Sequence, residues 1–331
     1  MRVLVTGATG FIGRHVVDSL LARGHTVRAA HRLDSRTDFP AEVELAQVDL
    51  ASGARLREAL SDVDVVIHAA AVMQGPPETQ YEGTVSATKN LLSAMATAGV
   101  TKLVLVSSFA VYSGQAARRR HQVDENSSVA TPATARDAYC EMKLRQESLV
   151  REVAASAQWS ATVARPGFVF GPDHLWSNRL GYRFGQYAWL CVGGRAALPV
   201  SYVDNCADAL AFLAEQTAAG LRIVNIVDDK PPTQSEYRKR LAAGVGRPKV
   251  VIVLPWPLVH FLLRLLNRID GLSGRRLSLP AILRLEAGRA RWQPTRYSNQ
   301  ALRELGWSPP VPFEKAIEAS TGSGVTRRSS E

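Results

Sequence analysis

The sequence predicts an α/β fold built on a doubly wound parallel sheet, with helices on both faces and a smaller substrate lobe toward the C-terminus. Over the first 110 residues, short apolar runs alternate with segments of helical periodicity, which is typical of parallel strands joined by crossover helices. A glycine-rich turn at residues 7–13 separates the first apolar run from the first helical segment. A turn of this kind in this place is typical of a Rossmann-type sheet.

The strands and helices of the first part follow from this alternation. Nearly continuous apolar runs predict strands that are covered on both faces, and apolar residues spaced three and four apart predict helices. The expected strands are Val3–Thr6, Thr26–Ala30, Glu44–Val48, Val63–Ala71 and Lys102–Ser107, and the expected helices are Arg14–Ala22 and Val85–Ala98.

The later part of the chain is less regular. Further strands are expected at Thr162–Phe170 and Leu221–Val227, whereas residues 173–199 and 228–318 suggest helices and loops. We therefore assign residues 1–172, with 200–227 returning to them, to an NAD(P)-binding Rossmann domain. Residues 173–199 and 228–318 form the expected substrate-binding lobe, and residues 319–331 are expected to be a disordered tail.

The charge balance is basic, with 40 Lys and Arg against 30 Asp and Glu and a formal net charge of +10. Basic proteins attract nucleic acids, membranes or phosphorylated small molecules. The densest basic run, Arg118–Arg120, is short and has no interleaved aromatic residues, so we expect no nucleic-acid partner.

The cysteines are few and scattered. Cys140, Cys191 and Cys206 lack the spacing of metal ligands, which predicts no metal site and fits a reducing, cytoplasmic compartment. Met1 and Arg2 run directly into the first strand and leave no room for the apolar region of a signal peptide.

One apolar segment, residues 250–266, has two interpretations. It falls short of the roughly 20 uninterrupted apolar residues that a membrane span needs, because Pro255, Pro257, His260 and Arg264 interrupt it. It is either a core or lid helix of the second lobe, or a segment that rests on the inner membrane surface or lines an apolar substrate site.

The glycine turn predicts a phosphate-binding loop. One glycine permits the tight turn, one lets the backbone approach a pyrophosphate, and one lets the helix and the strand pack closely. The anion would meet free N–H groups at the positive end of the helix. A glycine turn without a ligand is the alternative. The predicted contacts are Gly7, Thr9, Gly10, Phe11, Ile12 and Gly13.

The end of the second strand distinguishes NADP from NAD. An acidic residue there binds the adenosine ribose, whereas an arginine accommodates a 2′-phosphate. This chain has His31 and Arg32, and no acid until Asp34, so NADP is preferred and NAD is the alternative. If Arg32 is only an ordinary surface charge, it gives no preference for NADP over NAD. Asp49 and Leu50, after the third strand, are expected beside the adenine.

Tyr139 and Lys143 are four residues apart and therefore share one helix face. A neighbouring ammonium lowers the pKa of a tyrosine by favouring its phenolate, and Lys143 is also placed to hold ribose hydroxyls. Ser108, at the end of a buried strand, would hydrogen-bond the reacting oxygen of an alcohol or ketone. The alternatives are a chance Tyr–Lys pair and a serine that only caps the strand.

Together these segments resemble the extended short-chain dehydrogenase/reductases over about residues 1–318. The resemblance rests on residues 6–13, 66–71, 107–112, 139–143, 165–172, 202–204 and 305–307. It implies that Ser108, Tyr139 and Lys143 are the catalytic set. It also implies that the backbone of Ala69, Ala70 and Ala71, and that of Arg165 to Val169 with Pro166, line the cofactor.

Two positions depart from the family pattern. Thr84 stands where the family has an Asn that supports a water linked to the catalytic lysine, so a proton relay through this position is in doubt. Ser113 replaces the usual glycine.

Three reactions are compared with this pattern. The dehydratases carry an Asp–Glu pair where this chain has Phe109 and Ala110, which argues against dehydration. A hydroxyl–ketone dehydrogenase like the 3β-hydroxysteroid and sterol branch is favoured by residues 202–205, by the apolar segment and by Tyr297–Ser298. A sugar-nucleotide epimerase would need basic residues around a diphosphate; the candidates are Arg195, Arg289 and Arg291, each otherwise an ordinary surface arginine.

The expected partner is a small-molecule substrate, and a homodimer is a further expectation. A dinucleotide-binding redox sensor is the non-enzyme alternative. Such relatives typically lack the Tyr–Lys pair, so Tyr139 and Lys143 argue against it here.

Overall fold

A computed structural model describes residues 1–33, 35, 37–114, 116, 122–155, 158–185, 187–217, 220–273, 279–280 and 283–322. Asp34, the run Arg118–Arg120 and residues 323–331, on which sequence predictions rest, lie outside the described residues.

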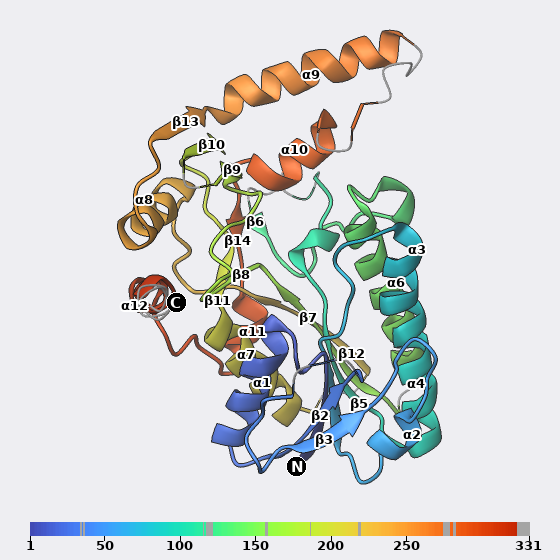
Figure 1. Ribbon diagram of the computed structural model, residues 1–331. Coiled ribbons are helices and arrows are strands. Elements are labelled where there is room, and N and C mark those ends of the chain that lie inside the picture. Colours follow the sequence, from blue (N-terminus) through green and yellow to red (C-terminus); the bar gives the residue numbers. More distant parts are fainter. Residues whose placement is uncertain are drawn as a thin grey trace.

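A seven-stranded sheet forms the lower half of the molecule in Figure 1, and all its strands are parallel. The strand order is β12-β7-β5-β4-β1-β2-β3, so the order reverses between β1 and β4. This is the Rossmann arrangement, and it confirms the predicted fold class. The strands are β1 (Arg2–Thr6), β2 (Thr26–His31), β3 (Glu44–Gln47), β4 (Val65–His68), β5 (Lys102–Val106), β7 (Ser160–Pro166) and β12 (Gly220–Ile226).

Helices cover both faces of this sheet. One core gathers α1 (Phe11–Ala22) and α7 (Val203–Glu215), and the other gathers α4 (Ala87–Ala98) and α6 (Ala138–Ala154). Successive residues of β1 enter opposite cores, Val3 into the first and Leu4 into the second, and both are fully buried. A strand between two cores needs apolar residues at every position, which explains the continuous apolar runs of the sequence.

The second lobe contains more strand than the sequence predicts. A three-stranded sheet, β13 (Val250–Leu254), β10 (Ala188–Val192) and β9 (Gly181–Phe184), joins two segments that were expected to hold helices and loops. The larger helices of this part are α8 (Gln234–Val245), α9 (Trp256–Leu272), α10 (Leu285–Trp292) and α12 (Phe313–Gly322). Two-stranded sheets pair β8 (Phe168–Phe170) with β11 (Val200–Tyr202) and β6 (Gln122–Val123) with β14 (Arg296–Tyr297).

The predicted strand over 162–170 is wrong in one respect, because the chain leaves the main sheet in its middle. β7 ends at Pro166, and β8 then pairs with β11 instead. Gly167 lies against the backbone of Pro199 so closely that a Cβ would overlap its carbonyl oxygen. The change of sheet thus depends on a close approach of two backbones that no local pattern reveals.

Other element boundaries differ as well. The strand predicted to reach residue 71 ends at His68, and the backbone of Ala69–Ala71 then leaves the ladder. The helix predicted from residue 85 begins at Ala87, after a π-helix, η1 (Tyr81–Ser86). α12 extends to Gly322, so residues 319–322 are helical, and the predicted tail beginning at 319 is wrong there.

Part of the chain assigned to the second lobe packs in the first core. Leu302, from α11 (Gln300–Glu304), is fully buried there beside Trp307. The Trp307 indole donates a hydrogen bond of 2.8 Å to Asp208 on α7. These contacts tie residues 300–307 to the large sheet.

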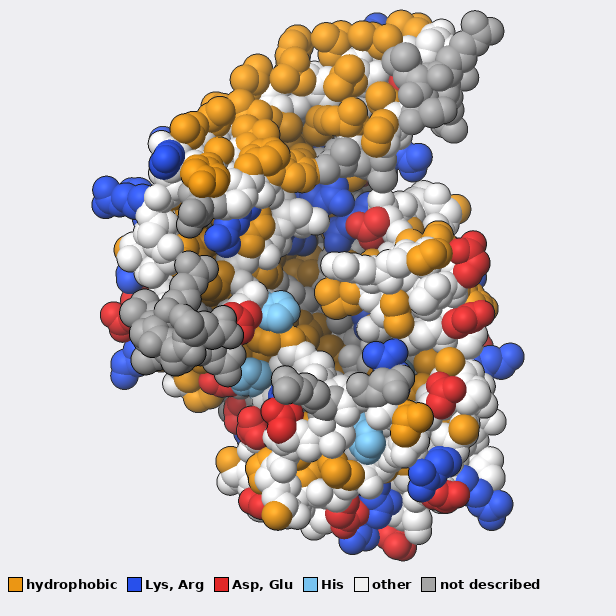
Figure 2. Space-filling view, in the orientation of Figure 1, with side chains coloured by type: hydrophobic (Ala, Val, Ile, Leu, Met, Phe, Trp, Pro, Cys, Tyr) orange, Lys and Arg blue, Asp and Glu red, His pale blue; other side chains and the backbone are white. Residues whose placement is uncertain are grey.

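The apolar segment 250–266 forms β13 and the first part of α9, and it is not a core helix. Only Leu263 of α9 is buried. Phe261 is 63% exposed and Leu265 is 46% exposed, and Figure 2 shows hydrophobic side chains gathered over α9 and β13. The core-helix interpretation is therefore wrong. Among the described residues, no helix combines the length and apolar character that a membrane crossing requires.

Candidate functional site

The glycine turn between β1 and α1 is shaped by close backbone contacts. Gly7 has φ +69°, in the left-handed region, and a Cβ there would lie 2.7 Å from the backbone nitrogen of Ala70. A Cβ on Gly13 would overlap the carbonyl oxygen of Gly7, so this glycine lets α1 pack on the turn. The Gly10 N–H donates to the Gly7 carbonyl at 3.0 Å and closes the turn.

The N-terminus of α1 fits an anion. Gly10 is its N-cap and offers no side-chain oxygen to the first N–H groups, and the first turn contains no acidic residue. These N–H groups and the positive end of the helix dipole are therefore available to a phosphate.

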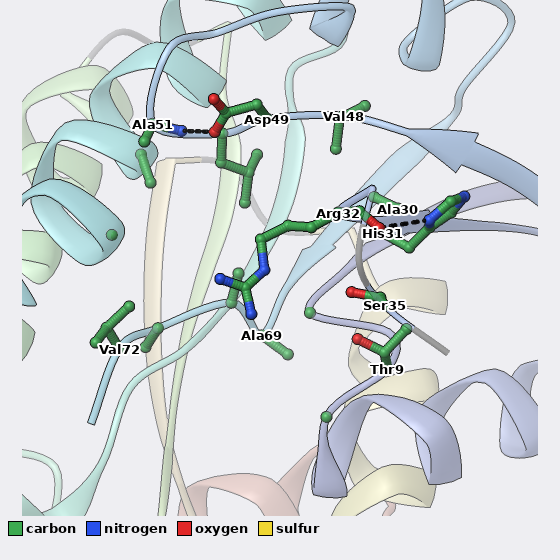
Figure 3. A pocket seen from close by; sticks show the side chains of 17 residues that line it. Thr9, Ala30, His31, Arg32, Ser35, Val48, Asp49, Ala51, Ala69 and Val72 are labelled. Carbon is green, nitrogen blue, oxygen red and sulfur yellow. Dashed lines mark hydrogen bonds between the residues drawn. The ribbon is translucent and has the colours of Figure 1, made fainter. Parts of the chain in front are cut away.

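A cleft of about 330 Å³ opens along the ends of β1, β2, β3 and β4 (Figure 3). Of the predicted cofactor contacts, it is lined by Gly7, Thr9, Gly10, His31, Arg32, Asp49, Leu50, Ala69, Ala70 and Ala71. Sequence reasoning missed its other lining residues: Ala30, Ser35, Val48, Ala51, Val72, Gly83 and Ala87. Gly83 and Ala87 come from the η1–α4 segment, and no pattern in the nearby sequence predicts that this segment reaches the cleft.

Five predicted contacts do not line this cleft. Phe11 stacks on His174 with ring centroids 3.9 Å apart, and Ile12 packs against the core. Gly13 is buried under the turn. Pro166 is the last residue of β7 and Val169 lies in β8, so neither belongs to the strand ends that line the cleft.

Arg32 extends into the cleft between the β3 end and the β4 end (Figure 3). It is exposed, and its guanidinium has no ion pair with any carboxylate among the described residues. The Asp49 carboxylate is held by hydrogen bonds from the Ser52 hydroxyl and the Ala51 N–H, which lower its pKa, and Arg32 lowers it further. His31 shares a 3.0 Å hydrogen bond with the Arg32 carbonyl.

Ser108 and Tyr139 meet beyond the end of β5. Ser108 caps the 3₁₀ turn η2 (Phe109–Val111), where its hydroxyl accepts from the Ala110 N–H at 3.1 Å. Tyr139 lies in the first turn of α6, whose N-cap is Asp137. The Ser108 side chain is near enough to Tyr139 to lower the pKa of its phenol. Burial is the larger effect and raises that pKa above its ordinary value.

Lys143 is buried behind this pair. Its ammonium donates to the Val106 carbonyl at 2.8 Å and to the Gln146 side-chain oxygen at 2.9 Å. Burial lowers the pKa of Lys143 to about 8. Arg136 also lowers the pKa of Tyr139, although burial has the larger effect. That Lys143 lowers this pKa as well stays a prediction.

A buried polar network supports Lys143. The Gln146 amide donates to Thr88 at 2.8 Å and contacts the His68 ring at 3.2 Å. Burial lowers the pKa of His68 to about 3, so its ring is neutral and accepts or donates only as an imidazole. Gln146 thereby has a fixed orientation with its oxygen toward the ammonium.

Thr84 does not face this network with its hydroxyl. That oxygen accepts from the Val72 N–H at 3.0 Å, while the Thr84 carbonyl accepts from the Thr88 hydroxyl at 2.6 Å. Thr84 lies in the π-helix η1, a distortion that is frequent at functional sites. Its side chain fixes the loop after β4 and is not placed to relay protons to Lys143.

The three arginines proposed to bind a diphosphate differ in how exposed their side chains are. Arg195 is exposed, as an ordinary surface arginine would be. Arg289 and Arg291 lie on α10, with side chains that are 7% and 9% exposed, so their interpretation as surface residues is wrong. Arg289 pairs with Glu286 at 2.7 Å. A helix that is buried on its basic face has no distinguishing sequence pattern.

Residues 202–205 are held in place by hydrogen bonds to a buried carboxylate. The Tyr202 N–H and the Asn205 amide donate to the Asp228 carboxylate at 3.1 and 3.0 Å. Asp228 is 5% exposed, and burial raises its pKa to about 7. Within the described ranges, no group of three or more His, Cys, Asp and Glu side chains is placed to hold a metal ion.

The model of the NAD dependent epimerase/dehydratase family matches residues 3–226. A 2-alkyl-3-oxoalkanoate reductase of Stenotrophomonas maltophilia is 30% identical, with 98% of this chain and 100% of the relative covered. A 3-beta-hydroxysteroid dehydrogenase of Mycolicibacterium neoaurum is 29% identical over 96% of this chain and 89% of the relative.

Solved structures share the fold. The UDP-glucose 4-epimerase of Thermus thermophilus, in a complex with NAD, has a TM-score of 0.71 and 23% identity, and the match covers 97% of this chain and 98% of that chain.

Proposed function

Because the chain belongs to the NAD-dependent epimerase/dehydratase family, whose members are NAD-dependent enzymes, we propose that it transfers hydride between nicotinamide and a secondary hydroxyl or keto group. The observation that carries this proposal is the placement of Ser108 near Tyr139 beyond β5, with Lys143 buried behind them. The glycine turn would hold the pyrophosphate of the dinucleotide, and the cleft beside it would hold the adenosine. When bound, the nicotinamide supplies or accepts the hydride.

The proton chemistry falls to this chain's own residues. In reduction, Ser108 and Tyr139 would both bind the carbonyl oxygen, and the Tyr139 hydroxyl would release its proton to that oxygen as hydride reaches the carbon. Burial raises the pKa of Tyr139, so this proton is present at neutral pH. Lys143 would then stabilise the negative charge that remains on the site, while Gln146 and Val106 hold its ammonium.

The substrate is proposed to be bulky and apolar, like those named for the two relatives, a steroid and an alkyl oxoalkanoate. A nucleotide-sugar epimerase is the second candidate, and the buried Arg291, which lies 3.6 Å from Asp137 at the start of α6, favours it. The two differ in net redox change: a dehydrogenase accumulates oxidised or reduced cofactor, whereas an epimerase returns its hydride.

The catalytic roles are tested by Tyr139→Phe, with Tyr187→Phe as an exposed control on the surface. Tyr139→Phe should bind the dinucleotide as the unchanged chain does and lose about 10²-fold or more of turnover. The assay follows cofactor absorbance with steroid, oxoalkanoate and sugar-nucleotide substrates. Unchanged turnover of Tyr139→Phe would contradict the assignment.

NADP is proposed as the preferred dinucleotide, with NAD as the weaker alternative. Arg32 supports this preference, because its guanidinium forms no ion pair with a carboxylate of the described residues and projects into the cleft where the adenosine ribose would lie. The 2′-phosphate of NADP would then form charge-assisted hydrogen bonds that NAD lacks.

We also propose that the α9–β13 face rests on a membrane surface. Val251 on β13 and Phe261 and Leu265 on α9 are exposed, and exposed Arg264 and Arg268 interrupt the apolar surface with positive charge. An amphipathic helix with basic residues suits the interface of an anionic bilayer.

Liposome flotation with anionic vesicles tests this contact. Phe261→Glu should reduce binding, whereas Phe184→Glu, a similarly exposed phenylalanine on β9, is the matched control. If the unchanged chain and both variants stay to the same extent in the lipid-free fraction, the proposal is contradicted. A second copy of the chain on this face would appear instead as a dimer in size-exclusion chromatography.

A further inference from the structure

Three arginines from distant parts of the chain gather near the start of α6, the helix that carries Tyr139. Arg136 precedes α6, Arg179 lies between β8 and β9, and Arg291 is on α10. Burial lowers the pKa of Arg179 and that of Arg291, and Arg136 is near enough to both to lower these pKa values further. The cluster therefore concentrates like charges in a poorly solvated place.

One carboxylate faces Arg136 and Arg291. Asp137 lies 3.4 Å from the Arg136 Nε and 3.6 Å from the Arg291 Nη2, both at the same oxygen, Oδ2. Its other oxygen caps α6 by accepting from the Cys140 N–H at 2.9 Å. Since a single carboxylate carries one charge, it leaves this cluster with an excess of positive charge.

Hydrogen-bonding groups in the cluster also lack partners. Arg291 is 9% exposed, and its Nε and Nη1 are buried without a hydrogen bond to any residue that the structure describes. The same holds for the Nε of Arg136 and for the hydroxyl of Tyr182 on β9. Buried polar groups are usually paired, so donors left free in one place indicate an absent acceptor.

The location links this acceptor to the reaction. Arg136 is three residues from Tyr139 and close enough to lower its pKa. Arg291 is on α10, which packs beneath α9 in Figure 1. An anion at the cluster would therefore sit between the proposed catalytic tyrosine and the exposed apolar face.

We propose that Arg136 and Arg291, with the Tyr182 hydroxyl, bind an anionic oxygen group of the substrate, a carboxylate or a phosphate. This inference rests on the proposed function, because it names the substrate of the same site. The bulky apolar substrate would then be an amphiphile whose acidic group is near the reacting carbon; for the epimerase alternative, it would be a sugar phosphate.

The test uses the full chain saturated with NADP, so that the glycine turn is already occupied. Inorganic phosphate, pyrophosphate and octanoate are titrated by calorimetry, with chloride at equal ionic strength and neutral octanol as controls. Phosphate and octanoate distinguish a phosphate group from a carboxylate. We expect saturable binding of at least one anion, weakened at least about tenfold by Arg291→Gln and by Arg136→Gln.

Arg195→Gln, an exposed arginine outside the cluster, is the matched control and should bind as the unchanged chain does. Equal affinity in all four proteins, or no saturation beyond the chloride control, would overturn the proposal. Arg291→Lys keeps the charge, so it should retain part of the affinity if Arg291→Gln fails to fold. Binding of NADP, measured separately by fluorescence, distinguishes failure of this site from failure of the proposed oxidoreductase.

Discussion

Replacing Arg32 with alanine should selectively weaken the binding of NADP. Arg32 lines the cleft at the end of β2 and is exposed. It forms no ion pair with the described carboxylates, so its removal leaves no buried partner behind and should not change stability. The same change in an exposed arginine of α2 (Leu56–Ala59), Arg57→Ala, provides a control outside the cleft.

The magnitude follows from what the 2′-phosphate would lose. Hydrogen bonds to charged groups contribute about 1.5–3 kcal/mol each, and an exposed guanidinium is screened by solvent and salt. One such interaction at the low end corresponds to a Kd for NADP that rises about tenfold. Arg32 also offsets the Asp49 charge, whose pKa it lowers, so its loss adds repulsion toward the phosphate.

Fluorescence titration of NADPH and NADH measures both affinities. Arg32→Ala should raise the Kd for NADPH about tenfold and leave that for NADH within about twofold. The difference should shrink at 1 M salt, where the Debye length is about 3 Å. The assignment of Arg32 is refuted if both affinities fall equally or if neither changes.

Three further outcomes test other parts of the structure. Gly13→Ala should destabilise the fold by about 1–3 kcal/mol in urea denaturation, because its Cβ would overlap the turn, whereas Gly271→Ala has open space and should not. Burial raises the pKa of Asp228 in the folded protein to about 7, so the contribution of this residue to stability is present at low pH and is lost as the pH rises through 7. The free energy of unfolding should therefore fall by about 1 kcal/mol from pH 6 to pH 8. Asp228→Asn should remove this fall. Gln146→Leu removes an acceptor of the Lys143 ammonium, whose pKa of about 8 should fall further, shifting the corresponding limb of the pH–rate profile to lower pH; an unmoved profile would contradict this role.

Much of the dinucleotide side of the molecule could be predicted from sequence. The strands of the large sheet are buried on both faces, so each strand can be recognised from its own run of apolar residues. The turn from Gly7 to Gly13 is equally local, since its glycines are required by contacts within one β–α unit or with the neighbouring strand end. Tyr139 and Lys143 share a helix, and spacing alone places them together.

The environment of those residues depended on tertiary structure. Spacing cannot show that the Lys143 ammonium binds Val106 and Gln146, or that Arg136 is near enough to Tyr139 to lower its pKa. The break at Gly167 is likewise invisible, because it results from a contact with a segment more than thirty residues away.

The sequence alone thus determined the sheet, the phosphate loop and the Tyr–Lys pair, because each depends on neighbours within a few residues or on burial that every residue of a strand shares. Tertiary structure decided the rest. The periodicity of α9 is the same whether its apolar face meets protein or solvent, and only packing shows that Phe261 and Leu265 are exposed. Arg136, Arg179 and Arg291 are separated by up to 155 positions, and folding alone brings their charges together near the start of α6.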